Sequence, residues 1–264
     1  VNISMYFKTT GRLITTSTAC TSGSLGVGSA YEAIKNGYAD VMIAGGSDEL
    51  HPTQIAIFDT LYATSQKNST PELTPSPFDA ERDGLVIGEG AGTLILEEYE
   101  HAKKRGANIL AEIIGFATNT DGNHITTPNR PTVAKVMELS LESAKLSPDK
   151  IGYINAHGTG TIQGDMTESN ATYDVFKRAV PISSLKSYTG HTLGACGAIE
   201  AILTIEMMNK KWFHPTLNLN KVAEDCAPLD YIMHTGREID TNYVMSNNFA
   251  FGGINTSLIF TNRF

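Results

Sequence analysis

One cysteine near the start of the chain stands in a setting that suits nucleophilic chemistry. Cys20 lies in the segment 17–23, STACTSG, where a β-type run, Arg12–Thr16, gives way to small residues typical of the start of a buried helix. Free amide groups and the helix dipole stabilise a thiolate at such a position, so we expect the pKa of Cys20 to fall from about 8.5 toward neutrality. Taken alone, a small buried core cysteine is the commoner interpretation.

Two histidines strengthen the case for a reactive thiol. His157 lies in the segment 155–161, NAHGTGT, and His191 lies in the segment 186–195, KSYTGHTLGA. Both follow predicted strands, where open α/β folds place their sites, and the glycines beside them let a substrate approach closely. Each histidine alone would be interpreted as a loop residue with local hydrogen bonds. Two such loops in one chain with Cys20 indicate a reactive site.

Lys186 directly follows an apolar segment, 182–185, that is predicted to be a buried strand. A lysine at that position is either a surface residue or a buried ammonium group. A buried ammonium group needs acidic or polar partners. If Lys186 is buried, the chain must therefore bring carboxylates to it.

The elements that position these residues alternate between strands and helices. The repeated strand–helix–strand order predicts an α/β fold with largely parallel sheets that helices cover on both faces. Residues 117–131 are rich in Asn, Asp, Gly, Thr and Pro and are predicted to form a loop. Apolar runs predict strands at 41–44, 92–97, 109–116, 151–156, 182–185, 243–246 and 256–260, and helical spacing predicts helices that end at 36 or span 132–144, 165–178 and 195–209.

Composition excludes several classes of protein. The 264 residues carry 20 basic and 28 acidic side chains, a net charge of −8, which argues against a nucleic-acid partner. No stretch approaches the roughly 18 apolar residues of a membrane span. Residues 1–8 lack the features of a secretory signal, so we expect a cytoplasmic protein with no membrane partner. Cys20, Cys196 and Cys226 are too few and too widely spaced for a disulfide framework or a structural zinc site.

Several motifs together resemble the elongating β-ketoacyl-acyl-carrier-protein synthases, the ketosynthases of the thiolase-like superfamily. The resemblance rests on the surroundings of Cys20, on the His157 and His191 motifs and on the segment 248–255, NFAFGGIN. It runs the length of the chain. Supporting segments are PFD at 77–79, RDG at 82–84, GEGAG at 88–92, GD at 164–165 and Glu168.

Within that family the chain is most similar to ketosynthases of bacterial polyene pathways, such as aryl polyene synthesis. This narrower similarity rests on Glu49, on the segment 58–65, FDTLYATS, and on the segment 191–197, HTLGACG. The related thiolases use a Cys-His-Cys set, and the initiating synthases use a Cys-His-Asn set. This chain offers Cys-His-His with a lysine, so the resemblance favours the elongating branch.

The resemblance implies a five-layer αβαβα fold built from two similar halves. The first half would comprise residues 1–112 and carry the nucleophile. The second would comprise residues 113–264 and carry the histidines and a gating loop. In the family, several strands and helices precede the nucleophile, whereas only 19 residues precede Cys20 here. We therefore expect an incomplete N-terminal half.

The activity that the resemblance implies is a decarboxylating Claisen condensation in fatty-acid or polyketide chain elongation. An acyl chain would be held as a thioester on Cys20, and a malonyl thioester would lose carbon dioxide and attack it. The backbone N–H groups of Cys20 and Phe251 would form the oxyanion hole for the acyl thioester, at about 3–4 kcal/mol for each donor. The side chains of His157 and His191 would serve the malonyl thioester. The catalytic set that the resemblance implies is Cys20, His157, Lys186 and His191.

The resemblance also assigns supporting and binding roles. Asp165, Glu168 and Glu200 would form a charge network around Lys186 that orients the histidines. Phe251 would open and close the acyl pocket, although without the resemblance it would be interpreted as a core residue. The residues implied to bind substrate or the phosphopantetheine arm are Thr159, Thr161, Phe249, Phe251 and Gly252, and those of a second moving loop are His124, Thr126 and Pro128.

The resemblance implies no cofactor and no metal, because the substrate is carried on the phosphopantetheine arm of an acyl carrier protein. The expected partners are that carrier protein, malonyl and acyl thioesters, and a second subunit. That subunit would be either a copy of this chain or a chain-length-factor-like protein.

Two other functions stay open. The first is a non-catalytic or fragmentary partner, chain-length-factor-like, that needs another chain to complete the site. The second is a thiolase. Chain-length-factor-like partners typically lack the cysteine. The presence of Cys20, together with His157, Lys186 and His191, therefore disfavours the first function. His191 and the segment 249–253, FAFGG, disfavour the second.

Overall fold

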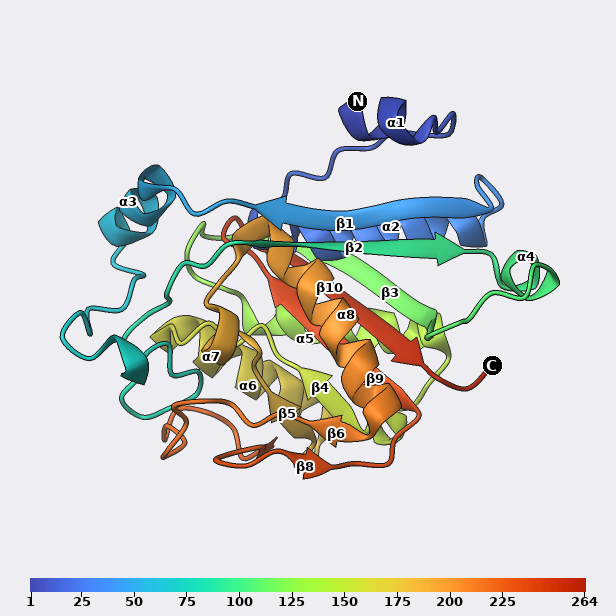
Figure 1. The fold of residues 1–264 in the computed structure, drawn as a ribbon. Helices are drawn as coiled ribbons and strands as arrows, with labels where there is room; N and C mark the ends of the chain where they lie inside the picture. Colours follow the sequence, from blue (N-terminus) through green and yellow to red (C-terminus); the bar gives the residue numbers. More distant parts are fainter.

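The computed structural model describes all residues from Val1 to Phe264, and two main sheets with helices between and behind them form its body (Figure 1). The smaller sheet pairs β1 (Val41–Asp48) with β2 (Gly90–Glu97). The larger sheet has six strands in the order β3 (Glu112–Thr120), β10 (Ile254–Thr261), β9 (Tyr243–Phe249), β4 (Tyr153–Asn155), β5 (Pro181–Ser183) and β7 (Asp230–Tyr231).

The strand directions show that the expectation of largely parallel sheets is wrong for part of the fold. Strands β9, β4, β5 and β7 are parallel neighbours, but β1 and β2 are antiparallel, and so are β3, β10 and β9. The short turn 250–253 joins β9 to β10 and reverses the chain, which makes that pair antiparallel. The parallel part includes the two strands, β4 and β5, that precede the histidine loops.

Helices separate the two sheets. α2 (Ser22–Lys35) and α8 (Cys196–Lys210) pack against both of them, and α5 (Arg130–Ala144) and α6 (Ile162–Phe176) cover the other face of the larger sheet (Figure 1). Two clusters of buried apolar side chains fill the spaces on either side of the larger sheet. These are four of the five layers of the expected αβαβα arrangement.

The fifth layer would cover the outer face of the β1–β2 sheet. The one helix on that side, α1 (Asn2–Phe7), projects above β1 in Figure 1 and has no buried residue, so it does not form that layer. Val41, Ile43 and Ile95 are exposed on the sheet, in line with the expected incomplete N-terminal half. The strand predicted at 41–44 therefore has no fully buried residue. The strand is also longer than predicted, since β1 continues through Gly45 to Asp48. At Gly45 a Cβ would lie 2.0 Å from the carbonyl oxygen of Gly92, so the two strands leave no room for a side chain there.

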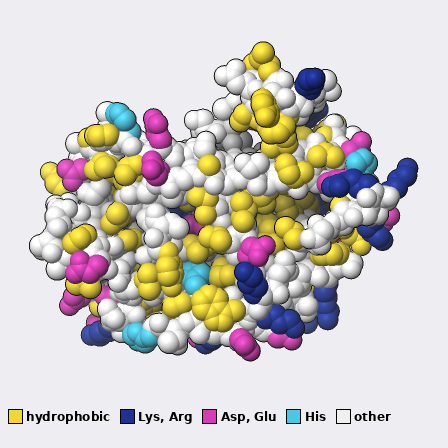
Figure 2. Space-filling view, in the orientation of Figure 1, with side chains coloured by type: hydrophobic (Ala, Val, Ile, Leu, Met, Phe, Trp, Pro, Cys, Tyr) yellow, Lys and Arg dark blue, Asp and Glu magenta, His cyan; other side chains and the backbone are white.

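The N-terminal segment differs from its prediction. Residues 12–16 form no strand and lie between α1 (Asn2–Phe7) and the 3-10 turn Ala19–Thr21. A strand needs a neighbour to satisfy its backbone groups, and β1 is paired only with β2. The N-terminal segment projects at the top of Figure 1, and hydrophobic side chains gather at the same place in Figure 2. Ile3 and Tyr6 of α1 are exposed.

The other predicted strands and helices are present with shifted ends, and some elements were not predicted. The division into halves at 112 and 113 falls at the first residues of β3 and stays a prediction. None of the helices combines the length and the apolar character needed to span a bilayer. The elements without a prediction include α3 (Pro52–Thr60), α7 (Lys186–Thr189), β6 (Trp212–Phe213) and β8 (Arg237–Glu238). A short helix, α4 (Tyr99–Lys104), carries the charged residues that follow β2.

Candidate active site

Cys20 lies in a 3-10 turn that leads directly into α2, as the small-residue segment predicted. Ala19, the residue before it, has a φ of 50°, which is uncommon for a residue other than glycine. This turn redirects the chain at Cys20. Cys20 is only 3% exposed and faces the residues described below.

His191 stands against the thiol. Its Nε2 lies 3.0 Å from the Sγ of Cys20. The main chain of His191 is held by Val86, whose carbonyl accepts its N–H at 2.7 Å, and by the N–H of Gly88 at 2.9 Å. The Nδ1 atom of His191 accepts the N–H of Leu193 at 3.3 Å, so the ring hydrogen resides on Nε2 and points toward the sulfur.

His157 lies beside His191 in the same arrangement. The two imidazole rings are nearly perpendicular, with their centroids 5.1 Å apart. The Nδ1 atom of His157 faces the Nδ2 atom of Asn248 at 3.5 Å, which also leaves the ring hydrogen on Nε2. Burial, with a smaller contribution from the positive charge of Lys186, lowers the pKa of both histidines well below the ordinary value. Both rings are therefore neutral and carry an N–H donor.

Lys186 is buried and forms an ion pair, which is one of the two possibilities that its position after the predicted strand allowed. Its Nζ contacts Glu200, whose other carboxylate oxygen accepts a hydrogen bond from Asn248 at 2.6 Å. Burial alone would lower the pKa of Lys186, but its interactions with Cys196 and Glu200 raise it overall. Lys186 is thus a fixed positive charge behind the histidines.

Two buried carboxylates hold the turn that carries His157. Glu168 accepts the N–H groups of His157 and Gly158 at 2.8 and 2.7 Å. Asp165 accepts those of Thr159 and Gly160 at 3.0 and 3.2 Å. Burial raises the pKa of Asp165 to about 6 and that of Glu168 to about 8. These contacts shape the backbone and do not reach the ring of His157.

The expectation of a depressed thiol pKa is wrong. Burial raises the pKa of Cys20 to about 11 and outweighs the opposing effects. Those effects come from the backbone amides of Phe251 and Cys20 and from the charge of Lys186. The helix start supplies N–H donors that stabilise the thiolate, but the free-energy cost of removing the thiolate from water is larger than that stabilisation. The resting residue is therefore a thiol.

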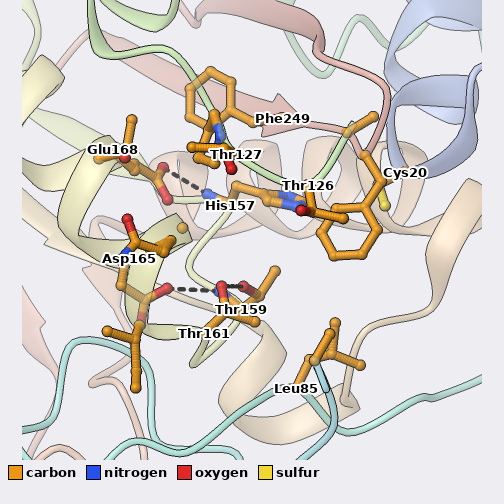
Figure 3. A pocket seen from close by; sticks show the side chains of 18 of the residues that line it. Cys20, Leu85, Thr126, Thr127, His157, Thr159, Thr161, Asp165, Glu168 and Phe249 are labelled. Carbon is orange, nitrogen blue, oxygen red and sulfur yellow. Dashed lines mark hydrogen bonds between the residues drawn. The ribbon is translucent and has the colours of Figure 1, made fainter. Parts of the chain in front are cut away.

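A cavity of about 380 Å³ opens onto these groups (Figure 3). Phe58, Leu61 and Tyr62, at and just beyond the end of α3, also line it. The segment 58–65 carried the narrower family similarity, but its residues were not predicted to line the site, because they form no buried face. Lys186, Glu200 and Gly252 lie outside the lining. The predicted site residues that line the cavity are Cys20, His124, Thr126, Pro128, His157, Thr159, Thr161, Asp165, Glu168, His191, Phe249 and Phe251.

The two segments predicted to move meet at the cavity mouth. The N–H of Gly252 donates to the carbonyl of Ile125 at 2.8 Å, which joins the 249–253 turn to the 124–128 loop. Gly252 has a φ of 93°, in the region that glycine adopts without strain. The ring of Phe251 packs on Phe58 with a centroid distance of 5.2 Å.

Asn248 is a site residue that sequence reasoning missed. It links Glu200 to His157, and its only sequence signal was its place at the start of the NFAFGGIN segment. The bond to Glu200 fixes which end of its amide is the nitrogen. Asn248 therefore sets the tautomer of His157.

The ligand atoms of Cys20, His157 and His191 lie within 4.8 Å of one another, which is close enough for a metal site. A histidine that binds metal donates its other ring N–H to an acceptor. Here the Nδ1 of His191 faces the N–H of Leu193, and that of His157 faces the amide of Asn248. The cluster thus fits a pair of hydrogen-bond donors better than it fits a metal.

Both parts of the chain match models of one enzyme family. "Beta-ketoacyl synthase, N-terminal domain" matches residues 1–102, and "Beta-ketoacyl synthase, C-terminal domain" matches residues 110–220. Together the two models match most of the chain, and the layered α/β fold agrees with them. The chain belongs to the β-ketoacyl synthase family, with its thiolase-like fold.

Three relatives show how similar the chain is to proteins of this family. It is 41% identical over 266 residues to 3-oxoacyl-[acyl-carrier-protein] synthase 2 of Vibrio harveyi, an alignment that covers 98% of this chain and 64% of the relative. A β-ketoacyl synthase structure from Burkholderia phymatum STM815 is 61% identical with a TM-score of 0.98, over 98% of this chain and 64% of that chain. A ketosynthase solved in complex with its chain length factor, from Xenorhabdus doucetiae, is 33% identical with a TM-score of 0.87, over 98% and 62% of the two chains. The chain therefore spans less than two thirds of the length of these relatives.

Proposed function

We propose that this chain carries the active site of a β-ketoacyl-acyl-carrier-protein synthase that elongates a fatty-acid or polyketide chain. One observation carries the proposal: the thiol of Cys20 and two neutral imidazole N–H donors, from His157 and His191, face one cavity. A thiol can carry an acyl group, and two fixed donors can stabilise the oxygen of an enolate.

The first half-reaction is acyl transfer to Cys20. The sulfur attacks the carbonyl carbon of the incoming thioester, the bond from that carbon to the carrier sulfur breaks, and the proton of the Cys20 thiol passes to the departing carrier thiolate, which leaves as a thiol. The negative oxygen of the intermediate needs donors, and the backbone amides of Cys20 and Phe251 are available because both already act on the sulfur. We assign these two amides as the oxyanion hole for the acyl thioester.

The second half-reaction is decarboxylation and condensation. The bond between the malonyl carboxylate and its α-carbon breaks, carbon dioxide leaves, and the electron pair becomes an enolate on the thioester. The Nε2–H groups of His157 and His191 donate hydrogen bonds to the enolate oxygen. Neutral rings suit this role because they keep their ring hydrogens and take up no additional proton that would have to be removed afterwards. The enolate carbon then attacks the acyl group, and Cys20 leaves as a thiolate.

Lys186 supports this step from behind the site. We propose that its charge, fixed by Glu200 and relayed through Asn248, keeps both imidazoles neutral and holds His157 in its tautomer. Asp165 and Glu168 are proposed to support the His157 turn without moving protons.

The cavity mouth is proposed to admit the phosphopantetheine arm of an acyl carrier protein. The hydroxyls of Thr159 and Thr161 lie 2.9 Å apart on the lining and can hold the arm. Phe249, Phe251 and Gly252 would bind the substrate and open the pocket, together with His124, Thr126 and Pro128. Phe251→Ala should change acyl-transfer rates differently for short and long acyl chains, and unchanged ratios would reject the gate.

The partner and the pathway are finer proposals. Similarity to a ketosynthase that was solved with its chain length factor supports a heterodimer of that kind, and a homodimer is the alternative. The segments at 58–65 and 191–197 support a polyene-type pathway, such as aryl polyene synthesis. All three cysteines are free thiols, which fits a reducing, cytoplasmic compartment.

Intact mass spectrometry tests the proposal. The purified chain is incubated with an acyl-pantetheine thioester and, separately, with an acyl carrier protein thioester, and Cys20→Ser serves as the control. An acyl adduct on Cys20 that is absent from the control supports the catalytic role. If iodoacetamide alkylates Cys20 but neither thioester acylates it, a non-catalytic, chain-length-factor-like role replaces the proposal.

A further inference from the structure

A second buried thiol touches the main chain of the nucleophile. Cys196 is the first residue of α8, is 2% exposed, and has its Sγ 3.3 Å from the carbonyl oxygen of Cys20. It takes no part in the proposed condensation and does not line the cavity. No disulfide joins the two residues, since both are free cysteines.

Glycines bring the starts of α2 and α8 into direct contact. A Cβ at Gly23 would lie 2.8 Å from the carbonyl oxygen of Gly194, and a Cβ at Gly197 would lie 2.7 Å from the nitrogen of Ser24. Real Cβ atoms do not come so close, so the two main chains meet without side chains between them. Two cysteines thus stand at the junction of two helix starts.

Only one of the two thiols is open to a small reagent. Cys20 lines the cavity, whereas Cys196 lies behind it, against Asn248, whose Nδ2 is 3.6 Å from the Cys196 sulfur. A reagent that enters the cavity therefore meets Cys20 first. Burial raises the pKa of both thiols, and the charge of Lys186 opposes this effect at each sulfur without overcoming it.

We propose that Cys196 is a resolving thiol for Cys20, so that a hydroperoxide entering the active-site cavity converts the pair into a reversible disulfide. The inference rests on the proposed function, because it requires Cys20 to be the reactive thiol of the cavity. It adds a modification site that the condensation does not use.

The chemistry balances in two steps. The Cys20 thiolate attacks the hydroperoxide, the O–O bond breaks, and Cys20 becomes a sulfenic acid while the peroxide is reduced to an alcohol or to water. The Cys196 thiol then attacks the Cys20 sulfur, the S–O bond breaks, and water leaves with the thiol proton. Together the two cysteines lose two electrons and two protons to the peroxide, and a dithiol reagent returns them.

The disulfide would protect the nucleophile. Without a resolving thiol, a sulfenic acid is oxidised further to sulfinic and sulfonic acids, which thiols do not reduce. With Cys196 present, oxidation stops at a form that is inactive but recoverable. Cys196→Ser and Cys196→Ala keep the thiol of Cys20 and remove this protection.

The test uses the purified chain, hydrogen peroxide and intact mass with peptide mapping. The natural chain should lose about 2 Da, carry a Cys20–Cys196 cross-link, resist iodoacetamide at Cys20, and recover fully with dithiothreitol. Both Cys196 variants should instead gain two or three oxygen atoms at Cys20 and fail to recover. Cys226→Ser is the matched control and should behave like the natural chain.

Two outcomes would overturn the inference: irreversible oxidation of the natural chain at the same rate as the Cys196 variants, or a cross-link that involves Cys226. Acylation of the reduced chain by a thioester reports separately on the proposed function. A chain that is acylated but forms no Cys20–Cys196 disulfide rejects this inference alone. A chain that forms the disulfide but is never acylated rejects the condensation role.

Discussion

Replacing Lys186 by methionine should destabilise the protein strongly and in a pH-dependent way. Lys186 and Glu200 are 1% and 2% exposed, and they form an ion pair between α7 and α8. Removing one partner of a buried pair leaves the other charge without compensation and costs about 3–5 kcal/mol. That loss is a large part of the roughly 5–15 kcal/mol by which a domain is stable.

The pH dependence follows from Glu200. Burial already raises the pKa of Glu200, and the loss of Lys186 raises it further, because the ammonium is the main opposing influence. A carboxyl group whose pKa is raised in the folded state stabilises the fold while it is protonated, and that stability is lost as the pH rises through the folded-state pKa. Lys186→Met should therefore lose more stability at alkaline than at acidic pH.

Urea unfolding at several pH values measures the effect, and the double variant Lys186→Met, Glu200→Gln is the control. With no buried charge left, the double variant should recover most of the loss, to within about 1–2 kcal/mol of the natural chain. The pKa values of His157 and His191, followed by NMR, should rise in both variants, since Lys186 lowers them. A Lys186→Met chain with near-natural stability at all pH values would refute the reasoning.

Two further predictions concern the nucleophile and the helix junction. Iodoacetamide should alkylate Cys20 about tenfold faster for each pH unit over roughly pH 7–9, because the thiolate reacts and burial raises the pKa of Cys20 to about 11; a plateau near neutral pH would contradict this. Gly23→Ala should cost about 1–3 kcal/mol in urea unfolding, because its Cβ would lie 2.8 Å from the oxygen of Gly194. Gly11→Ala, which meets nothing within 4 Å, should be nearly neutral, and equal losses in the two variants would show that the junction is not tightly packed.

The sequence predicted the parts of the site that local patterns encode. The strands before His157 and Lys186, the helix after Cys20 and the family motifs are local, and the structure brings these residues together. The direction of the strands was not predictable in the same way. β10 runs antiparallel to β9 because the turn between them reverses the chain, and that turn depends on Gly252 and Gly253, which both have positive φ.

Other features depend on contacts between distant segments. The raised pKa of Cys20 results from burial by α8 and the histidine loops, which a helix-start argument does not include. The role of Asn248 depends on a hydrogen bond to Glu200, 48 positions away. The contact of Cys196 with Cys20 joins residues 176 positions apart, and no spacing rule predicts it.

The distance along the chain between the two sides of the site bears on how the protein is made. Cys20 and its partner His191 are 171 residues apart, so the thiol leaves the ribosome long before the imidazole that will stand beside it exists. The N-terminal part folds first during synthesis, while such long-range contacts form late. During translation Cys20 is therefore without His191, and its surroundings are complete only after β9 and β10 have taken their places between β3 and β4 in the larger sheet.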